Sequence, residues 1–222
     1  MNLHGDFARA VAIDSTALTW LPSAHEGVER RMLERIGGEV ARATSVVRYA
    51  PGSSFGAHVH GGGEEFLVLD GVFSDEEGDY PKGFYVRNPP GSSHQPSTAV
   101  GATILVKLRQ MQIDDRAEVR IDTLDPAGWE TDGAGVRARL LYAGYGEQVE
   151  LLEWPDGYWG SWIWPDGVEY FVLSGGFDDE LGRHGTGAWL RLPPGAVQTV
   201  KAVARTRLYR KSGHLRNPVG VV

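Results

Sequence analysis

Three histidines and one glutamate stand at spacings that suit a metal site. His58 and His60 flank Val59, so in a strand both rings point to one face. Glu64 follows three consecutive glycines, which let the backbone bend tightly, and it joins that face if the strand continues. His94 follows a Pro-Pro-Gly turn that can swing it back over the same place. Imidazoles and a carboxylate suit zinc, iron, manganese, cobalt or nickel, so these residues predict one divalent metal site.

The elements that must position these residues belong to an internal repeat. Residues 63–91 match residues 167–195 without a gap at an offset of 104, and 14 of the 29 positions are identical, which indicates a duplication. Further upstream, VERRML at residue 28 resembles VRARLL at residue 136, at an offset of 108. The apolar positions of the first stretch also suit a helix, but its counterpart is typical of a strand, so we favour a strand for both.

Both copies consist of short apolar runs that end at glycine or at a Pro-Pro-Gly turn, which is the pattern of antiparallel strands. We therefore expect an all-β protein of two tandem jelly-roll β-barrels. The expected domains are residues 1–111, which carry the metal site, and residues 112–222, which lack its ligands.

The second copy replaces all four candidate ligands. At the offset of 104, the residues in the places of His58, His60, Glu64 and His94 are Trp162, Trp164, Val168 and Gln198. A tryptophan buries on the order of 200 Å², so two of them can fill space that ligands and an ion would take. We expect core filling here, in preference to an aromatic ligand cage that would also use Tyr158 and Trp159.

Polar residues kept in both copies do not depend on a metal and are interpreted as structural. Glu65 and Arg87 persist as Glu169 and Arg191, and Asp75-Glu76 persists as Asp179-Glu180. Glu65 has the opposite strand parity from Glu64 and is expected to point away from the metal. The acid-rich segment 75–80 is interpreted as a solvated turn. The remaining histidines are expected to face solvent: His4, His25, His184 and His214. Four further residues could reach a substrate, but strand parity does not place them: Tyr49, Phe66, Lys107 and Arg109.

The composition excludes several classes of function. The chain has no cysteine, which excludes disulfides, thiolate metal sites and cysteine nucleophiles. Its formal net charge is −7 and it has no basic stripe, so nucleic acid is not expected as a partner. No segment approaches the ~20 apolar residues of a membrane helix, and the amino-terminal residues lack the apolar core of a signal peptide. A cytoplasmic protein without a membrane partner is expected.

The ligand pattern resembles the cupin superfamily. The family's motif G-x5-H-x-H-x3-E-x6-G is matched from Gly52 to Gly71, and its motif G-x5-P-x-G-x2-H is matched from Gly83 to His94. Thr98 stands where the second motif usually ends in asparagine. Residues 58–96 are similar to the cupin domain of ChrR-type anti-sigma factors and of small dioxygenases grouped with it. The resemblance implies a bicupin that binds one metal through His58, His60, Glu64 and His94.

Two functions follow from this resemblance. In the first, the protein is a regulatory or sensory metal-binding module, and the favoured metal is zinc, with iron, manganese or nickel as alternatives. The helical anti-sigma domain of such proteins binds zinc through a His-Cys-Cys signature. This chain has no cysteine, so a sigma factor is not expected as a partner.

In the second function, the protein is an Fe(II)-dependent dioxygenase that cleaves a carbon–carbon bond of a small diketone or hydroxyketone. Four protein ligands leave two positions of an octahedral iron for O₂ and a chelating substrate, whereas they close the shell of a tetrahedral zinc. The first barrel is then expected to take a small-molecule ligand. No catalytic residue is assigned. Both a monomer and a homodimer fit, because barrels can pair within one chain or through remaining sheet edges.

Overall fold

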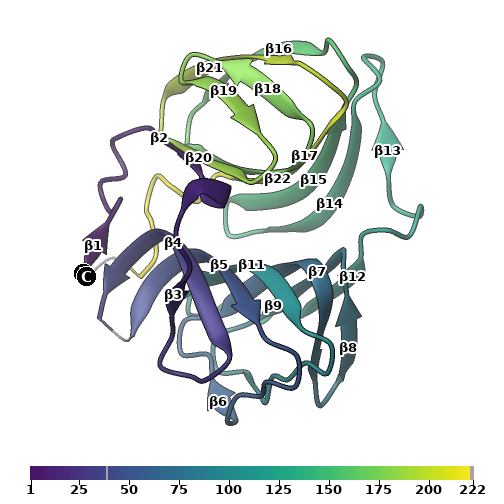
Figure 1. The fold of residues 1–222 in the computed structure, drawn as a ribbon. Coiled ribbons are helices and arrows are strands. Elements are labelled where there is room, and N and C mark those ends of the chain that lie inside the picture. The colour runs from purple at the N-terminus through teal and green to yellow at the C-terminus, as the bar shows by residue number, and fades with distance from the viewer. Residues whose placement is uncertain (39, 221–222) are drawn as a thin grey trace. The chain divides into compact units, whose positions relative to one another are not determined.

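The computed structural model describes residues 1–38 and 40–220, and in these residues the chain forms β-strands and one short 3-10 helix, η1 (Ser15–Ala17), with no α-helix (Figure 1). This confirms the all-β prediction. Two compact units are present. The first is built mainly from Leu18–Leu124 with Met1–Gly5, and the second from Asp125–Pro218 with Asp6–Ala17. The predicted boundary between residues 111 and 112 stays a prediction.

The first unit is a barrel of antiparallel strands. Its main sheet has the order β1-β4-β5-β11-β7-β9-β12, β3 is added to β4, β8 is added to β7, and β6 pairs with β10 in a separate ladder. The bounds are β1 (Asn2–Leu3), β3 (Leu21–Pro22), β4 (Val28–Gly37), β5 (Ala41–Tyr49), β6 (His58–Val59), β7 (Glu64–Asp75), β8 (Gly78–Pro81), β9 (Phe84–Asn88), β10 (Ser93–His94), β11 (Ala102–Leu108) and β12 (Val119–Asp122).

The second unit repeats this order. Its larger sheet runs β13-β14-β15-β22-β17-β20-β2, and its smaller sheet runs β16-β21-β18-β19. The succession β14-β15-β22-β17-β20 matches β4-β5-β11-β7-β9, which confirms the duplication. The bounds are β2 (Val11–Asp14), β13 (Glu130–Thr131), β14 (Arg137–Gly144), β15 (Glu147–Trp154), β16 (Trp159–Trp164), β17 (Val168–Ser174), β18 (Gly176–Asp179), β19 (Gly182–Gly185), β20 (Ala188–Leu192), β21 (Ala196–Ala202) and β22 (Thr206–Ser212).

The stretch VERRML, for which a helix was the alternative, lies in β4, and its counterpart VRARLL lies in β14 except for Val136, which directly precedes that strand. The strand prediction is therefore confirmed for both. Among the described residues, no helix has the length and apolar character needed to span a membrane.

A retained glycine bends each barrel at the same place. Gly71 and Gly175 have φ of +75° and +76°, a region that favours glycine. A Cβ would lie 2.0 Å from the carbonyl oxygen of Gly101 in the first case and 2.3 Å from that of Arg205 in the second. No side chain fits at either position. This bend lets β7 leave the main sheet and form the hairpin with β8 that lies behind the site described below.

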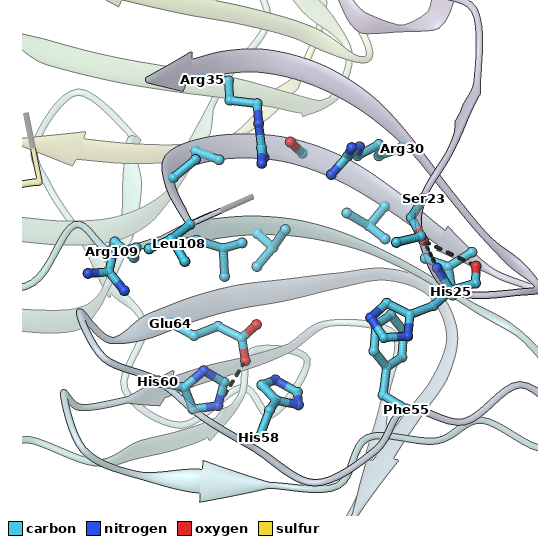
Figure 2. A pocket seen from close by; sticks show the side chains of 18 of the residues that line it. Ser23, His25, Arg30, Arg35, Phe55, His58, His60, Glu64, Leu108 and Arg109 are labelled. Atoms are coloured by element: carbon cyan, nitrogen blue, oxygen red, sulfur yellow. Dashed lines mark hydrogen bonds and ion pairs between the residues drawn. The ribbon is translucent and has the colours of Figure 1, made fainter. Parts of the chain in front are cut away.

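Aromatic and aliphatic side chains fill the two barrels to different extents. The first core cluster contains Phe66, Phe73 and Val86, all almost fully buried, and the second is built around Trp154, Tyr170 and Leu208. The first barrel also encloses a cavity of about 730 Å³ (Figure 2).

Candidate metal centre

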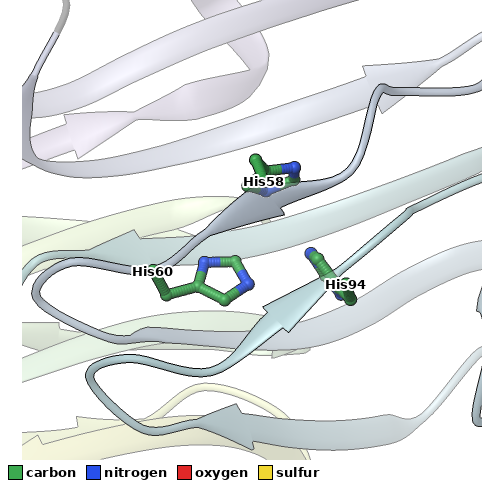
Figure 3. Close-up of side chains that lie close together, drawn as sticks. All are labelled: His58, His60 and His94. Atoms are coloured by element: carbon green, nitrogen blue, oxygen red, sulfur yellow. The ribbon is translucent and has the colours of Figure 1, made fainter.

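His58, His60 and His94 are brought together by the ladder between β6 and β10. The register pairs His94 directly with His58, and directly opposite residues present their side chains on the same face. His60 continues the alternation, because its N–H donates to the carbonyl of Ser92 at 2.9 Å. Figure 3 shows the three rings close together. One ligand nitrogen from each ring lies within 4.8 Å of the other two, so the three histidines could hold a metal ion.

Glu64 reaches the same point as the first residue of β7. The chain turns before it, because the N–H of Gly63 donates back to the carbonyl of His60 at 3.3 Å. Gly63 has φ of +76°, and a Cβ there would lie 2.4 Å from the sulfur of Met111. Glu64 Oε2 then lies 3.6 Å from His60 Nε2 and 3.4 Å from His94 Nε2. The glutamate therefore joins the histidines from the main sheet, and not by continuation of their strand.

The donor atoms at this point fit a metal ion. Nε2 of His60 and Nε2 of His94 are buried, and neither has a hydrogen-bond partner among the described residues. Atoms bound to one ion at about 2.1 Å stand about 3.0 to 3.4 Å apart, and Glu64 Oε2 is close to that separation from both nitrogens. Buried polar atoms without partners are costly, and an ion would satisfy all of them at once.

Burial sets the protonation of these side chains. It lowers the pKa of His60 to about 3, with further contributions from the neighbouring His94 and His58 rings, and it lowers the pKa of His94. Burial raises the pKa of Glu64 to about 7, against a hydrogen bond from Asn88. At neutral pH His60 and His94 are therefore neutral, as metal ligands must be, and Glu64 is about half protonated, with a proton that a cation can displace.

A buried carboxylate behind His94 orients its ring. Asp75 Oδ2 accepts a hydrogen bond from His94 Nδ1 at 3.2 Å, and Asp75 Oδ1 accepts one from the Tyr80 hydroxyl at 3.0 Å. This contact places the proton on Nδ1 and leaves the lone pair of Nε2 facing Glu64. The Asp75 side chain is only 1% exposed. The interpretation of residues 75–80 as a solvated turn is therefore wrong for Asp75 and Tyr80, which the β7–β8 hairpin turns inward.

Two of the four residues that strand parity left unplaced line the cavity beside the histidines. Tyr49 and Arg109 belong to its lining. Phe66 lies in the core cluster, and the Lys107 ammonium is buried and donates to the Thr44 hydroxyl at 2.9 Å. Tyr49 and Arg109 are therefore the two of this set that a molecule in the cavity can touch.

Both halves of the chain match one family. Residues 8–112 and residues 116–216 each match the model of the ChrR Cupin-like domain. The chain belongs to the ChrR cupin-like family. Each match covers one copy of the repeat, so the protein is a bicupin. No curated protein matches its sequence.

Solved structures similar to this bicupin share its fold at low sequence identity. A candidate dioxygenase from Nostoc punctiforme PCC 73102 has a TM-score of 0.76 at 16% identity, over 97% of this chain and 86% of that chain. YlbA from Escherichia coli has a TM-score of 0.71 at 15% identity, over 93% and 92% of the two chains. The pirin YhhW from Escherichia coli, solved in complex with nickel(II), has a TM-score of 0.69 at 10% identity, over 96% and 100%.

In the second cupin barrel, tryptophans occupy the positions of the first two histidines. Trp162 and Trp164 pack against the core cluster. The Trp162 ring is stacked on Trp154, with centroids 6.1 Å apart and 19° between the planes. The Trp164 indole N–H donates to Gln198 Oε1 at 3.2 Å. These inward side chains fill the barrel as expected, whereas Trp159 is 65% exposed and lies outside the packing.

The retained pair Glu65 and Arg87 forms a buried ion network of the first cupin barrel. Arg87 Nη1 donates to Glu65 Oε2 at 2.9 Å, and Arg87 Nη2 donates to Asp115 Oδ2 at 2.6 Å. The Tyr85 hydroxyl also donates to Glu65 Oε2, at 2.9 Å. All three charged side chains are at most 2% exposed. The structural role expected for Glu65 and Arg87 is thus a buried ion pair, and Asp115 is a third member that the repeat comparison did not indicate.

The retained glutamates Glu76 and Glu180 accept equivalent backbone hydrogen bonds in the two cupin barrels. Glu76 accepts a hydrogen bond from the backbone N–H of Gln95 at 2.8 Å, and Glu180 accepts one from that of Thr199 at 2.9 Å. Each donor directly follows the position of His94 or its replacement. This role needs no metal, which explains why it occurs in both copies.

Two of the four histidines expected to face solvent are buried, so the expectation is wrong for them. His184 is 5% exposed, and its Nε2 lies 2.6 Å from Asp179 Oδ1. His184 occupies the position of Tyr80 in the first copy, and both side chains turn inward to the same retained aspartate. The His214 side chain is 4% exposed. The expectation holds for His4 and His25, which are exposed.

Proposed function

We propose that this bicupin is a metal-dependent oxygenase whose first barrel binds one divalent transition metal through His58, His60, Glu64 and His94. The observation that carries the proposal is the cavity of about 730 Å³, because its lining includes His58, His60 and Glu64. A structural metal site is closed by its ligands, whereas a catalytic site keeps positions open toward a substrate. A volume of this size is typical of a small-molecule site.

The favoured substrate class is a small diketone or hydroxyketone, and the favoured metal for this chemistry is iron(II), with manganese or nickel as alternatives. Iron(II), when bound, supplies coordination of O₂ and of the substrate oxygens together with the electrons that activate O₂. The histidines hold neutral nitrogen donors in place. The second oxygen of the Glu64 carboxylate, Oε1, accepts the proton that an enolisable diketone loses from the carbon between its carbonyl groups.

The walls of the cavity support the same proposal. Phe73, Val106 and Leu108 present apolar surface to it, and this surface excludes water from the reacting groups. Among solved structures of the same fold are a candidate dioxygenase and a nickel(II)-bound pirin, which supports metal chemistry in this architecture without assigning it here.

A zinc-binding regulatory module is the second candidate function. The observation that favours it is the match of both halves to the ChrR Cupin-like domain, since that resemblance implies zinc. In this alternative, His58, His60, Glu64 and His94 close a tetrahedral shell and no position is left for O₂.

Metal analysis followed by oxygen uptake tests the proposal. We expect one equivalent of metal per chain after purification without added metal, and O₂ uptake with pentane-2,4-dione once the chain is loaded with Fe(II) in the absence of air. Uptake should vanish in His60→Ala and persist in His25→Ala, which alters the same cavity at a residue outside the ligand set. A tightly bound zinc with no uptake by the Fe(II)-loaded chain over a panel of diketones and hydroxyketones would favour the regulatory module.

A further inference from the structure

Two arginines of β4 face the candidate metal site across the cavity. Arg30 and Arg35 both line it, and Figure 2 shows their guanidinium ends pointing into the space on the side opposite His58 and Glu64. Neither arginine belongs to the cupin motifs or to the metal-ligand set. Two cations therefore lie at the end of the cavity opposite the candidate metal ligands.

A β-bulge brings both arginines to the same face. Residues five apart in a regular strand point to opposite faces. The pairing of β4 with β5 shifts between Met32 and Glu34, so Arg30 pairs with Val47 and Arg35 pairs with Ala43. Val47 and Ala43 lie on one face of β5, four residues apart. The bulge thus turns Arg35 into the cavity, which is a recurrent use of bulges beside binding sites.

The charge at this end of the cavity is not balanced by a lining carboxylate. Among the described residues that line the cavity, Glu64 is the one acidic side chain, whereas Arg30, Arg35 and Arg109 are basic. Arg30 Nε is buried and has no hydrogen-bond partner among the described residues. Burial lowers the pKa of Arg35, and the positive charge of Arg30 lowers it further, while the Arg35 guanidinium donates a hydrogen bond to the Gly38 carbonyl. An anion placed between them would relieve both costs.

The second copy provides an internal comparison. Its strand β14 has a register shift between Leu140 and Tyr142, which is the same position of the repeat at the offset of 108. The residues in the places of Arg30 and Arg35 are Ala138 and Ala143. The bulge is therefore kept as part of the barrel, while both arginines are absent from the copy that lacks the metal ligands. The common absence of the arginines and the ligands from the second copy associates the two cations with the candidate metal site and not with the stability of the barrel.

We propose that Arg30 and Arg35 form a carboxylate-binding site, and that the first barrel takes a small organic acid with a metal-coordinating oxygen at its other end. Between the two ends, Val47, Val106 and Leu108 line the cavity and suit a short apolar body. Arginine is suited to the first end because its planar fork donates two parallel hydrogen bonds to a carboxylate. The inference deepens the proposed function and rests on it for the position of the coordinating oxygen.

The test compares an acid with its neutral ester on the full chain. The probes are 4,6-dioxoheptanoate, a β-diketone with a carboxylate two methylene groups away, and its methyl ester. Their dissociation constants are measured by titration calorimetry without air on the Co(II)-loaded chain. The variants are Arg30→Gln, Arg35→Gln and Arg30→Lys. The matched control is Arg31→Gln, which removes the same charge from the adjacent residue, whose guanidinium stacks over Trp20 at 4.2 Å.

We expect the wild-type chain to bind the acid about tenfold more tightly than the ester, the ratio expected from one charge-assisted hydrogen bond. The ratio should fall to about threefold or less in both glutamine variants, take an intermediate value in Arg30→Lys and stay unchanged in Arg31→Gln. If Arg35→Gln does not fold, the Arg30 variants carry the test, because Arg30 is only half-buried.

Equal affinities for acid and ester, binding of neither probe, or an equal loss of preference in Arg31→Gln would overturn the inference. Metal content, measured on each sample beforehand, keeps the two proposals apart. A chain that binds metal but shows no preference for the acid refutes the carboxylate site alone. A chain that takes up no Co(II), yet prefers the acid in a manner dependent on Arg30 when it is titrated without metal, refutes the proposed metal function and supports the carboxylate site.

Discussion

Replacing Asp75 with asparagine is expected to weaken metal binding through the tautomer of His94. Asp75 Oδ2 accepts a hydrogen bond from His94 Nδ1, and Asp75 Oδ1 accepts one from the Tyr80 hydroxyl and one from the backbone N–H of Glu77. An asparagine has the same shape but one acceptor oxygen. If that oxygen keeps the Tyr80 hydroxyl, the amide N–H₂ faces His94 Nδ1, which must then act as an acceptor. The proton moves to Nε2, where the metal needs the lone pair.

The size of the effect follows from this geometry. The ligand itself is retained and only its tautomer and orientation are disfavoured, which in comparable sites costs about 10- to 100-fold in metal affinity, or about 1.4 to 2.7 kcal/mol. Competition with a chromogenic chelator for Zn(II) and Ni(II) at pH 7.5 measures the dissociation constants directly. A thermal melt of the metal-free chain separates this loss from unfolding.

The second barrel supplies a matched control in Asp179→Asn. Asp179 is the repeat equivalent of Asp75, and it accepts hydrogen bonds from His184 and from Gln198 at 2.6 and 2.8 Å. Its replacement should lower the melting temperature and leave metal affinity unchanged. An Asp75→Asn chain that binds metal within about twofold of the wild type would refute the orienting role of Asp75, because this is well below the expected range. An equal loss of affinity in both variants would point to a general effect on folding.

Three further outcomes are expected. Burial raises the pKa of Glu64 to about 7, so metal binding should release its proton and metal affinity should rise between pH 6 and pH 8. Calorimetry in buffers of different ionisation enthalpy should show that the wild type releases about 0.9 proton more than Glu64→Gln at pH 6 and about 0.1 more at pH 8. A difference in released protons that does not vary with pH contradicts this expectation. Arg87→Met should lower the free energy of unfolding, measured in urea, by about 3 to 5 kcal/mol, because it leaves two buried carboxylates without their cation. The control Lys82→Met, which breaks an exposed pair with Asp70, should change this free energy by about 0.5 kcal/mol or less. Similar losses in both variants would argue against the buried network. Trp162→Ala should lower the free energy of unfolding by about 3 kcal/mol, the lower end for aromatic truncation, because this side chain is partly buried. The metal content should not change. A gain of metal in the second barrel would contradict the role of Trp162 as core filling.

The sequence could predict the ligand cluster because each step depends on local geometry. The alternation of His58 and His60 follows from strand parity, and the Pro-Pro-Gly turn before His94 leads to a ladder that pairs it with His58. Glu64 was expected to join this face by continuation of the strand, whereas it reaches the histidines from β7 after a turn at Gly63. The positions of the three histidines do not depend on how the sheets close into a barrel, so their spacing in the sequence was enough to place them near each other.

Other parts of the site depend on register, which spacing does not reveal. Arg30 and Arg35 share a face only because the pairing shifts between Met32 and Glu34, and simple alternation places them on opposite faces. Asp75 is buried because its hairpin folds back onto the barrel, while Glu76 and Glu77, which follow it, are exposed. The available signal was their behaviour in the repeat, where the two arginines become alanines and the aspartate persists.

The contrast between Asp75 and the arginines shows how the duplication separates scaffold from chemistry. Asp179 remains in the second copy although the ligand beside it has become Gln198, because the Gln198 amide N–H donates to Asp179 at 2.8 Å just as the imidazole N–H donates to Asp75 in the first copy. The carboxylate has a hydrogen-bond donor in either barrel, so its presence does not require a metal. The arginines differ from this aspartate, because the charge of Arg30 lies close enough to Arg35 to lower its pKa, and an anion in the cavity would offset that repulsion. Their replacement by alanine in the barrel without the ligand set is the change expected when the anion they would bind is absent.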